Sequence, residues 1–284
     1  MSLDLTNIGT IRELMRRHNT RFSKGLGQNF LINPSVCPRI AELGGVDENT
    51  AVLEIGPGIG VLTVELAKRA KKVVSVELDN RLFPILKETL AEYPNVKVVE
   101  GDILKVDLHQ LFREEFDGME VVVCANLPYY ITSPVLMRLL EERLPIRSIT
   151  AMVQKEAAQR ITAPLPSREM GAITVSVAYY AETEILFPVS SGSFLPAPKV
   201  DSCVIRLDLH REPPVQVKEE TLFRVIRAAF SQRRKTLLNC LSSGLGMDKT
   251  PTREALERAG VDPGLRAEQL RLEDFAAIAN ALNT

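Results

Sequence analysis

The chain has 284 residues, of which 45% are hydrophobic and 25% charged, and its 35 basic and 36 acidic side chains give a formal net charge of −1. This length predicts one large domain and a smaller one. The composition is ordinary for a soluble globular protein, and the charge balance excludes an extremely basic nucleic-acid binder. Three scattered His and four Cys without a Cys-x-x-Cys pair match no zinc pattern, so we expect no metal site.

The first half of the chain alternates between β-branched segments and helical patterns. A short basic helix is expected at Ile11–His18, and a second from Asn33-Pro34 to about Leu43. Strands are then expected at Ala51–Ile55, Val73–Val76, Val96–Val99, Glu120–Cys124 and Ile149–Val153, and helices between them at Val61–Arg69, Arg81–Leu90 and Val135–Glu142. This alternation predicts right-handed crossovers and a parallel sheet that is covered on both faces.

The second half of the chain changes character near residue 210. Ser176–Tyr180 fits either a helix or a strand, and a hairpin that closes the sheet is expected from Ile185–Val189 and Cys203–Leu209. From Glu219 onward the pattern is helical, with breaks expected at Gly244–Gly246 and Gly260–Gly264. We therefore divide the chain into a domain of residues 1–212 and a helical domain of residues 213–284.

Charge is distributed unevenly along the chain. Residues 1–40 and 203–249 each have a net charge of +4, whereas residues 41–117 have a net charge of −6. The densest basic stretch lies within 224–239, contains no acid, and holds Arg224, Arg227, Arg233, Arg234 and Lys235. A solvated helix face and a phosphate-contacting helix are both consistent with this stretch, and its sequence alone does not decide between them.

The chain also lacks the sequence features of export. Its first residues have neither a basic region nor an apolar region of a signal peptide, and no apolar run approaches the roughly 18 residues of a membrane span. Together with the Cys usage, this predicts a cytoplasmic protein without a membrane partner.

A glycine-rich turn follows the first of the five expected strands. Gly56, Gly58 and Gly60 lie between that strand and a helix, where a ligand can approach backbone that has no Cβ atom. The dinucleotide fingerprint fails, because its third small residue is replaced here by Val61. The spacing from Glu54 through the three glycines is instead similar to the first motif of class I S-adenosylmethionine-dependent methyltransferases. A tight turn without a ligand remains the alternative.

Two acids follow the next two strands. Glu77 ends the second strand and can accept two hydrogen bonds from a ribose diol. Asp102 follows the third strand, where it can accept from an adenine amino group while Ile103 contacts the ring. Either acid alone could be an exposed strand end. Because parallel strands end at one crevice, the glycine turn and both acids predict a nucleoside site.

The fourth strand ends in Asn126-Leu-Pro-Tyr129, which suits chemistry on an exocyclic amine. Such a nitrogen is a poor nucleophile because its lone pair is delocalised into the ring. Acceptors for its two N–H groups draw it toward tetrahedral geometry. The Asn126 side-chain oxygen and the Leu127 carbonyl can accept, Pro128 restricts Leu127, and Tyr129 can stack on the base. The alternative is a Pro-Tyr turn before a helix.

Together these motifs resemble those of the ribosomal RNA adenine N6-dimethyltransferases, most closely their bacterial small-subunit (16S) branch, the kasugamycin-sensitivity enzymes. The resemblance runs from about Lys24 to Leu241 and also includes Gly27-Gln-Asn-Phe-Leu31, Val153-Gln-Lys-Glu156, Phe194-Leu-Pro-Ala-Pro-Lys-Val-Asp-Ser202 and Phe230-Ser-Gln-Arg-Arg-Lys235. It implies the class I S-adenosylmethionine-dependent methyltransferase fold: a Rossmann-like α/β sheet, mostly parallel, with a closing β-hairpin and a small all-helical C-terminal domain.

The resemblance also implies roles for individual residues. Cofactor contacts are expected from Gln28, Asn29, Leu31, Glu54, Gly56, Gly58, Gly60, Glu77, Leu78, Asp102, Ile103 and Asn126. The target base is expected to contact Asn126, Leu127, Pro128, Tyr129 and Phe194. Phosphate contacts are expected from Lys24 of the basic N-terminal arm and from Arg224, Arg227, Arg233, Arg234 and Lys235.

The activity that the resemblance implies is the dimethylation of two adjacent adenosines in the 3′-terminal hairpin of 16S rRNA, within a small ribosomal subunit precursor. We expect a monomer that uses S-adenosylmethionine, needs no metal, and transfers each methyl group by direct in-line displacement. The closest alternative is a 23S rRNA adenine N6-methyltransferase of the macrolide-resistance type. A non-catalytic ribosome-assembly factor is a second alternative, and an NAD dehydrogenase is a third.

Overall fold

The computed structural model describes residues 3–23 and 25–282, and by packing the chain forms two compact units. The first unit comprises Met1–Ala158 and Glu184–Leu209, and the second comprises Gln159–Thr183 and His210–Thr284. The packing thus adds residues 159–183 to the C-terminal helices. The chain passes between the units three times, and the sequence-based division at residue 212 lies close to the last of these boundaries, at 209/210. That division stays a prediction about domains.

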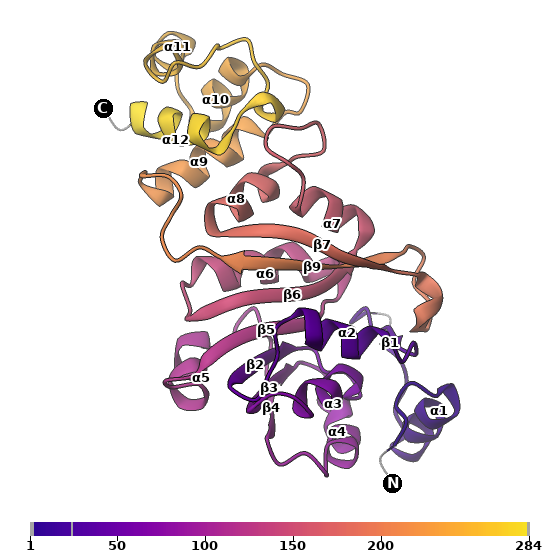
Figure 1. The fold of residues 1–284 in the computed structure, drawn as a ribbon. Coiled ribbons are helices and arrows are strands. Elements are labelled where there is room, and N and C mark those ends of the chain that lie inside the picture. The colour runs from indigo at the N-terminus through magenta and orange to yellow at the C-terminus, as the bar shows by residue number, and fades with distance from the viewer. Residues whose placement is uncertain (1–2, 24, 283–284) are drawn as a thin grey trace. The chain divides into compact units, whose positions relative to one another are not determined.

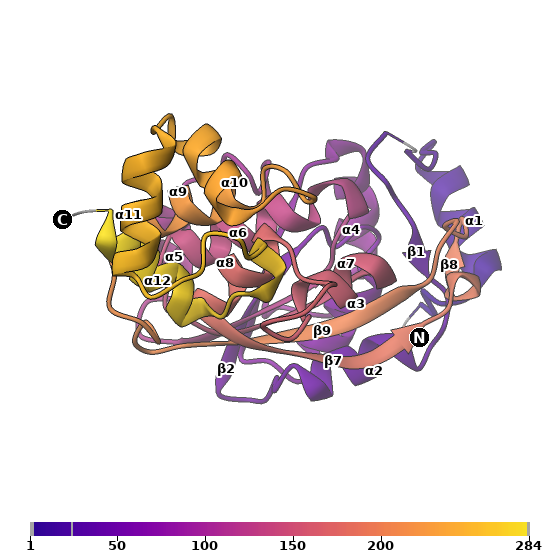
Figure 2. The same cartoon turned by 90° about the horizontal axis from the view of Figure 1, so that it is seen from above.

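A seven-stranded sheet forms the centre of the first unit (Figure 1). Its strand order is β4 (Val96–Glu100), β3 (Lys72–Glu77), β2 (Thr50–Ile55), β5 (Glu120–Asn126), β6 (Ile146–Gln154), β9 (Ser202–Leu209) and β7 (Ala181–Val189). The first five are parallel, as the alternation predicted, and β9 pairs with β6 in the antiparallel sense. The predicted closing hairpin is the neighbouring pair β7 and β9, which run alongside each other in Figure 2.

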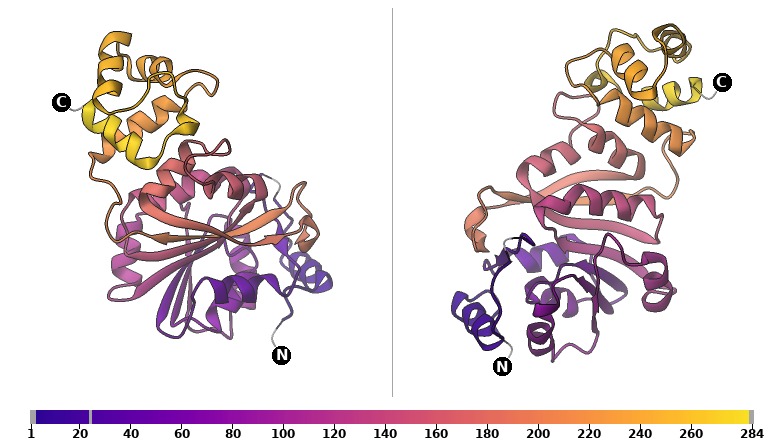
Figure 3. Two further views of the ribbon diagram at one scale, coloured as in Figure 1. Left: turned by 45° about the horizontal axis from the view of Figure 1, so that its top comes forward. Right: turned by 180° about the vertical axis from the view of Figure 1, so that it is seen from behind.

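Helices alternate with these strands, as the sequence predicts. Every residue of β2 is buried, which is typical of a central parallel strand with both faces covered. The helical segments of this region are α3 (Val61–Ala67), η1 (Asn80–Leu82), α4 (Phe83–Thr89), α5 (Leu108–Glu115), η2 (Tyr129–Ile131), α6 (Thr132–Glu141) and α7 (Lys155–Ile161). The same succession can be followed in the two views of Figure 3.

The N-terminal segment is attached to the first unit at several points. Helix α1 (Ile8–Arg17) begins at Asn7, whose side chain accepts from the backbone amides of Gly9 and Thr10. His18 Nε2 lies 2.7 Å from Glu88 Oε2 on α4. Beyond the connection come β1 (Phe30–Leu31) and α2 (Val36–Leu43), and β1 pairs antiparallel with β8 (Phe194–Leu195), which follows η3 (Ser191–Ser193).

The second unit is helical. It contains α8 (Ala172–Tyr180), α9 (Glu219–Ala229), α10 (Leu237–Leu245), α11 (Lys249–Arg258), η4 (Ala267–Gln269) and α12 (Leu272–Ala281). The ambiguous segment Ser176–Tyr180 is therefore helix, and Tyr180 stacks on Phe223 of α9 with ring centroids 5.6 Å apart. No helix in the described residues is both long and apolar enough to span a membrane.

One predicted helix break is wrong in part. Helix α10 continues through Gly244 and ends at Leu245, before Gly246 with a φ of +68°. Gly244 instead permits close helix packing, since a Cβ at this position would lie 2.7 Å from the Cβ of Ala228 on α9. The break predicted at Gly260–Gly264 is confirmed, because α11 ends at Arg258 and Gly260 has a φ of +72°.

Candidate active site

A pocket of about 1040 Å³, which includes space open to solvent, lies at the carboxyl ends of the parallel strands of the first unit. It is where the sequence predicts a nucleoside site. Its lining includes most of the predicted site residues: Gln28, Asn29, Leu31, Glu54, Gly56, Gly58, Glu77, Leu78, Asp102, Ile103, Asn126, Leu127, Pro128, Tyr129 and Phe194.

The glycine-rich turn forms one wall of this pocket. Gly56 and Gly58 have φ values of +68° and +61°, a region that favours glycine. A Cβ at Gly56 would meet no atom within 4 Å, so backbone is bare toward the pocket, whereas a Cβ at Gly58 would lie 3.0 Å from the Phe30 ring. Gly60 caps α3, and its Cβ would face Leu90 at 3.2 Å. Gly60 therefore serves packing, and its cofactor contact stays a prediction.

Glu77 is held rigidly at the end of β3. Its Oε2 accepts from the Gly58 amide at 3.1 Å, and its Oε1 accepts from the Asp79 amide at 2.8 Å. The side chain is buried, and burial raises its pKa. Two backbone bonds leave lone pairs on a carboxylate that can accept up to about four hydrogen bonds, so Glu77 can also accept from a diol in the pocket.

Glu54 lies deeper, behind the glycine turn. Glu54 is 1% exposed, and its carboxyl group accepts from the Ser75 hydroxyl at 2.5 Å. Burial and the negative charge of Glu77 raise the pKa of Glu54 to about 7. The site therefore contains a carboxyl group that changes charge near neutral pH.

The loop after β4 also lines the pocket. Asp102 Oδ1 accepts from the Leu104 amide at 2.9 Å, and the Asp102 carboxylate lies 3.5 Å from Lys105 Nζ. Ile103 is buried, and its carbonyl accepts from Arg138 of α6 at 2.7 Å. These bonds fix a carboxylate and an apolar side chain next to each other, which is the combination that recognises an adenine amine and ring.

Asn126 ends β5 with its amide group oriented. Its Nδ2 donates to the Asn29 carbonyl at 3.3 Å, so Oδ1 is the atom that can accept from a ligand. Leu127 is anchored by its own amide, which donates to the Met152 carbonyl of β6 at 3.1 Å. Pro128 follows with a φ of −56°. The turn thus presents an oriented acceptor beside a fixed backbone.

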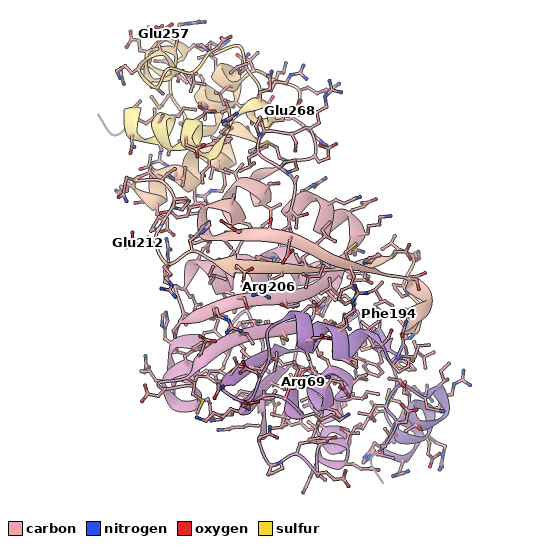
Figure 4. All side chains as sticks on the ribbon, in the orientation of Figure 1. Arg69, Phe194, Arg206, Glu212, Glu257 and Glu268 are labelled. Atoms are coloured by element: carbon pink, nitrogen blue, oxygen red, sulfur yellow. The ribbon has the colours of Figure 1, made fainter. Side chains whose placement is uncertain are left out.

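Two aromatic residues complete this end of the pocket. The Tyr129 hydroxyl lies 2.8 Å from Ser202 Oγ on β9, and burial raises the pKa of the phenol, which therefore stays neutral. Phe194, labelled in Figure 4, is 3% exposed and pairs through its backbone with Leu31. Phe194 thus belongs to the core and also lines the pocket.

The structure adds site residues that the sequence analysis missed. Asp79 accepts from Gln28 Nε2 at 2.7 Å and from the Arg81 guanidinium through two bonds of 2.7 Å. The Gln28 side-chain oxygen accepts from the Ser23 amide at 2.8 Å. Asp79 therefore fastens the loop that carries Gln28 to the end of β3. Tyr130 is a second residue that the sequence did not indicate; it lines the pocket and is 57% exposed.

The predicted phosphate-contacting residues lie in the second unit and are exposed, with the exception of Lys24, which lies outside the described residues. They do not share one helix. Arg224 and Arg227 are on α9, which ends at Ala229, and the remaining three occupy the connection before α10. Among the described residues, no cluster of His, Cys, Asp or Glu could hold a metal ion.

Comparison with known proteins agrees with this geometry. A family model described as ribosomal RNA adenine dimethylase matches residues 19–284. The chain belongs to the ribosomal RNA adenine dimethylase family. Relatives named ribosomal RNA small subunit methyltransferase A, from Geobacillus thermodenitrificans and Bacillus mycoides, are 47% and 46% identical to the chain. The first alignment covers 99% of this chain and 98% of the relative, and the second covers 98% and 97%.

Solved structures of the family share the fold. A dimethyladenosine transferase from Plasmodium falciparum has a TM-score of 0.75 and 27% identity, covering 89% of this chain and 97% of that one. The 23S rRNA methyltransferase ErmE has a TM-score of 0.68 and 30% identity, covering 90% and 100%. The predicted class I methyltransferase fold, and the assignment as an rRNA adenine dimethyltransferase, are confirmed.

Proposed function

We propose that the chain uses S-adenosylmethionine to dimethylate the N6 amines of two adjacent adenosines in the 3′-terminal hairpin of 16S rRNA, in a small-subunit precursor. The pocket fits this cofactor. The bare backbone at Gly56 leaves room for a ligand, Glu77 offers acceptors for a ribose diol, and Asp102 with Ile103 suits an adenine. When bound, the cofactor supplies an activated methyl group on a sulfonium leaving group.

The chain's own residues prepare the amine. Asn126 Oδ1 accepts one N–H, since its Nδ2 is occupied by Asn29, and the Leu127 carbonyl accepts the other. Tyr129 and Phe194 hold the base between two rings, which requires the adenosine to be unstacked from its RNA helix. Catalysis is then mainly positioning and exclusion of water, which can lower a barrier by several kcal/mol. The orientation of Asn126 carries this proposal.

The choice of small-subunit RNA is supported by the relatives. Those with that substrate in their name are 45–47% identical to the chain, whereas the 23S enzyme is 30% identical. Arg224, Arg227, Arg233, Arg234 and Lys235, together with Lys24, would contact rRNA phosphates. We infer that a monomer acts on the subunit and that no metal takes part.

Labelled S-adenosylmethionine tests the proposal when it is incubated with small subunits, large subunits or naked rRNA. We expect label in two adjacent adenosines of the small-subunit hairpin. Asn126→Ala should lower transfer at least about 100-fold, in line with the loss of a positioned hydrogen-bonding group at a reacting centre, while cofactor binding falls less. Asn49→Ala, at an exposed position, is the matched control. Label only in large-subunit RNA would favour the 23S activity, and no label would favour a pure assembly role.

A further inference from the structure

A second pocket lies entirely within the second unit, apart from the site described above. It encloses about 870 Å³, which includes space open to solvent. Its walls come from the end of α7, the start of α8, the connection between α9 and α10, and η4. Neither the cofactor nor the methyl transfer uses this pocket, although two of its residues, Arg233 and Lys235, are among the proposed rRNA phosphate contacts.

Three cationic side chains line this pocket: Arg160, Arg233 and Lys235. The backbone of Arg160 is anchored, because its carbonyl accepts from the Thr174 hydroxyl at 2.6 Å. Its side-chain stem passes close to Gly171, where an added Cβ would lie 3.5 Å from it. Arg233 donates to the Arg168 carbonyl at 3.2 Å. Within the described part of the chain, Arg160 and Lys235 form no ion pair, so their charges are available to an anion.

The pocket also has an apolar wall and an acceptor. Ile173 and Phe230 line it and are only partly buried, and Phe230 is backed by Phe275, with ring centroids 5.9 Å apart and planes inclined by 23°. Glu268 of η4, labelled in Figure 4, also lines this pocket and brings a carboxylate to it. An aromatic face, an acceptor and clustered cations are the three elements that recognise a base, its amino group and its phosphate.

We propose that this pocket binds a nucleotide, with the phosphate on Arg160, Arg233 and Lys235, the base against Ile173 and Phe230, and a base amino group on Glu268. The nucleotide could belong to an unstacked position of the RNA or be free in solution, and the chemistry of recognition is the same. Binding of an RNA nucleotide rests on the function proposed above, whereas binding of a free nucleotide does not.

The direct test is titration of the full chain with adenosine 5′-monophosphate, followed through the backbone amide resonances, with saturating S-adenosylhomocysteine to block the first pocket. Shifts are expected at residues 171–173 and 230–235. Uridine 5′-monophosphate, which lacks an amino group, should bind more weakly. Arg160→Ala should raise the Kd for the adenine nucleotide roughly tenfold or more, as a charge-assisted contact is lost. Arg253→Ala removes an exposed arginine of α11 outside this pocket and should change the Kd for the adenine nucleotide less than twofold.

The proposal is overturned if the nucleotide shifts no resonance of this pocket at roughly 10 mM, a concentration at which even a weak site would be occupied, or if both arginine variants lose affinity equally. Affinity for small subunits then separates the sources. A loss of affinity with Arg160→Ala, reproduced in the wild type when free nucleotide competes, assigns the pocket to RNA. An unchanged affinity assigns it to free nucleotides. If the wild type transfers methyl groups to rRNA but no nucleotide binds in this pocket, only the proposal for this pocket is overturned. If the nucleotide binds but no methyl group is transferred, only the proposed function is overturned.

Discussion

The buried carboxyl group of Glu54 predicts a contribution to the pH dependence of folding that a single substitution removes. Its pKa in the fold is about 7, against an ordinary value of 4.5. Between these values the folded chain holds a proton that the unfolded chain has released, so stability falls as the pH rises. At about 1.4 kcal/mol per pH unit, the loss from this group amounts to about 3 kcal/mol, complete above pH 7.

Glu54→Gln keeps the shape of the side chain and an acceptor for the Ser75 hydroxyl, but it does not titrate. The variant should therefore gain about 3 kcal/mol relative to wild type between pH 4.5 and pH 8. Glu77 also titrates from a raised pKa and is present in both proteins, so the difference isolates Glu54 and its coupling to Glu77. Urea unfolding followed by circular dichroism, with hydrogen exchange of the β2 amides to report on the first unit, measures it. Two curves that stay parallel over this range would refute the reasoning.

Two further substitutions test packing and the cofactor loop. Gly244→Ala places a Cβ 2.7 Å from that of Ala228, and should destabilise the second unit by roughly 1–3 kcal/mol in urea unfolding; Gly192→Ala, whose Cβ would have its nearest atom at 4.0 Å, is the control, and equal stabilities would contradict the packing argument. Asp79→Ala releases Gln28, so the KM for S-adenosylmethionine should rise about tenfold while kcat changes little; steady-state kinetics would contradict this if kcat fell with KM unchanged.

The strands and the positions at their ends could be predicted from the sequence because their determinants are local. β-branched runs fix β2, β3 and β5, and a parallel sheet then brings Gly56, Glu77 and Asn126 to one edge, where the structure places them. The residue types and their spacing were sufficient to predict this meeting of side chains, because few strand orders and connections are possible in such a sheet.

Residues whose role depends on distant contacts could not be predicted in this way. Asp79 is 51 residues from Gln28 in the sequence, and nothing near either residue indicates that they meet. Gly244 follows a helical pattern and lies two residues before Gly246, so its sequence resembles a helix end. Only the close approach of Ala228 explains this glycine. In both cases the missing information is the packing of one element on another, which periodicity does not contain.

The near-neutral net charge also omits information on contacts, because it does not show which charged side chains are paired. The first unit has 21 basic and 24 acidic side chains, and the second has 14 and 12, so neither total indicates an RNA-binding surface. The difference lies in pairing. In the first unit Lys68, Lys72 and Arg81 are each paired with a carboxylate. In the described part of the second unit, the five basic residues between Arg224 and Lys235 form no ion pair. Because unpaired cations attract phosphate more strongly than paired ones, the proposal that these five residues contact rRNA rests on local pairing and not on net charge.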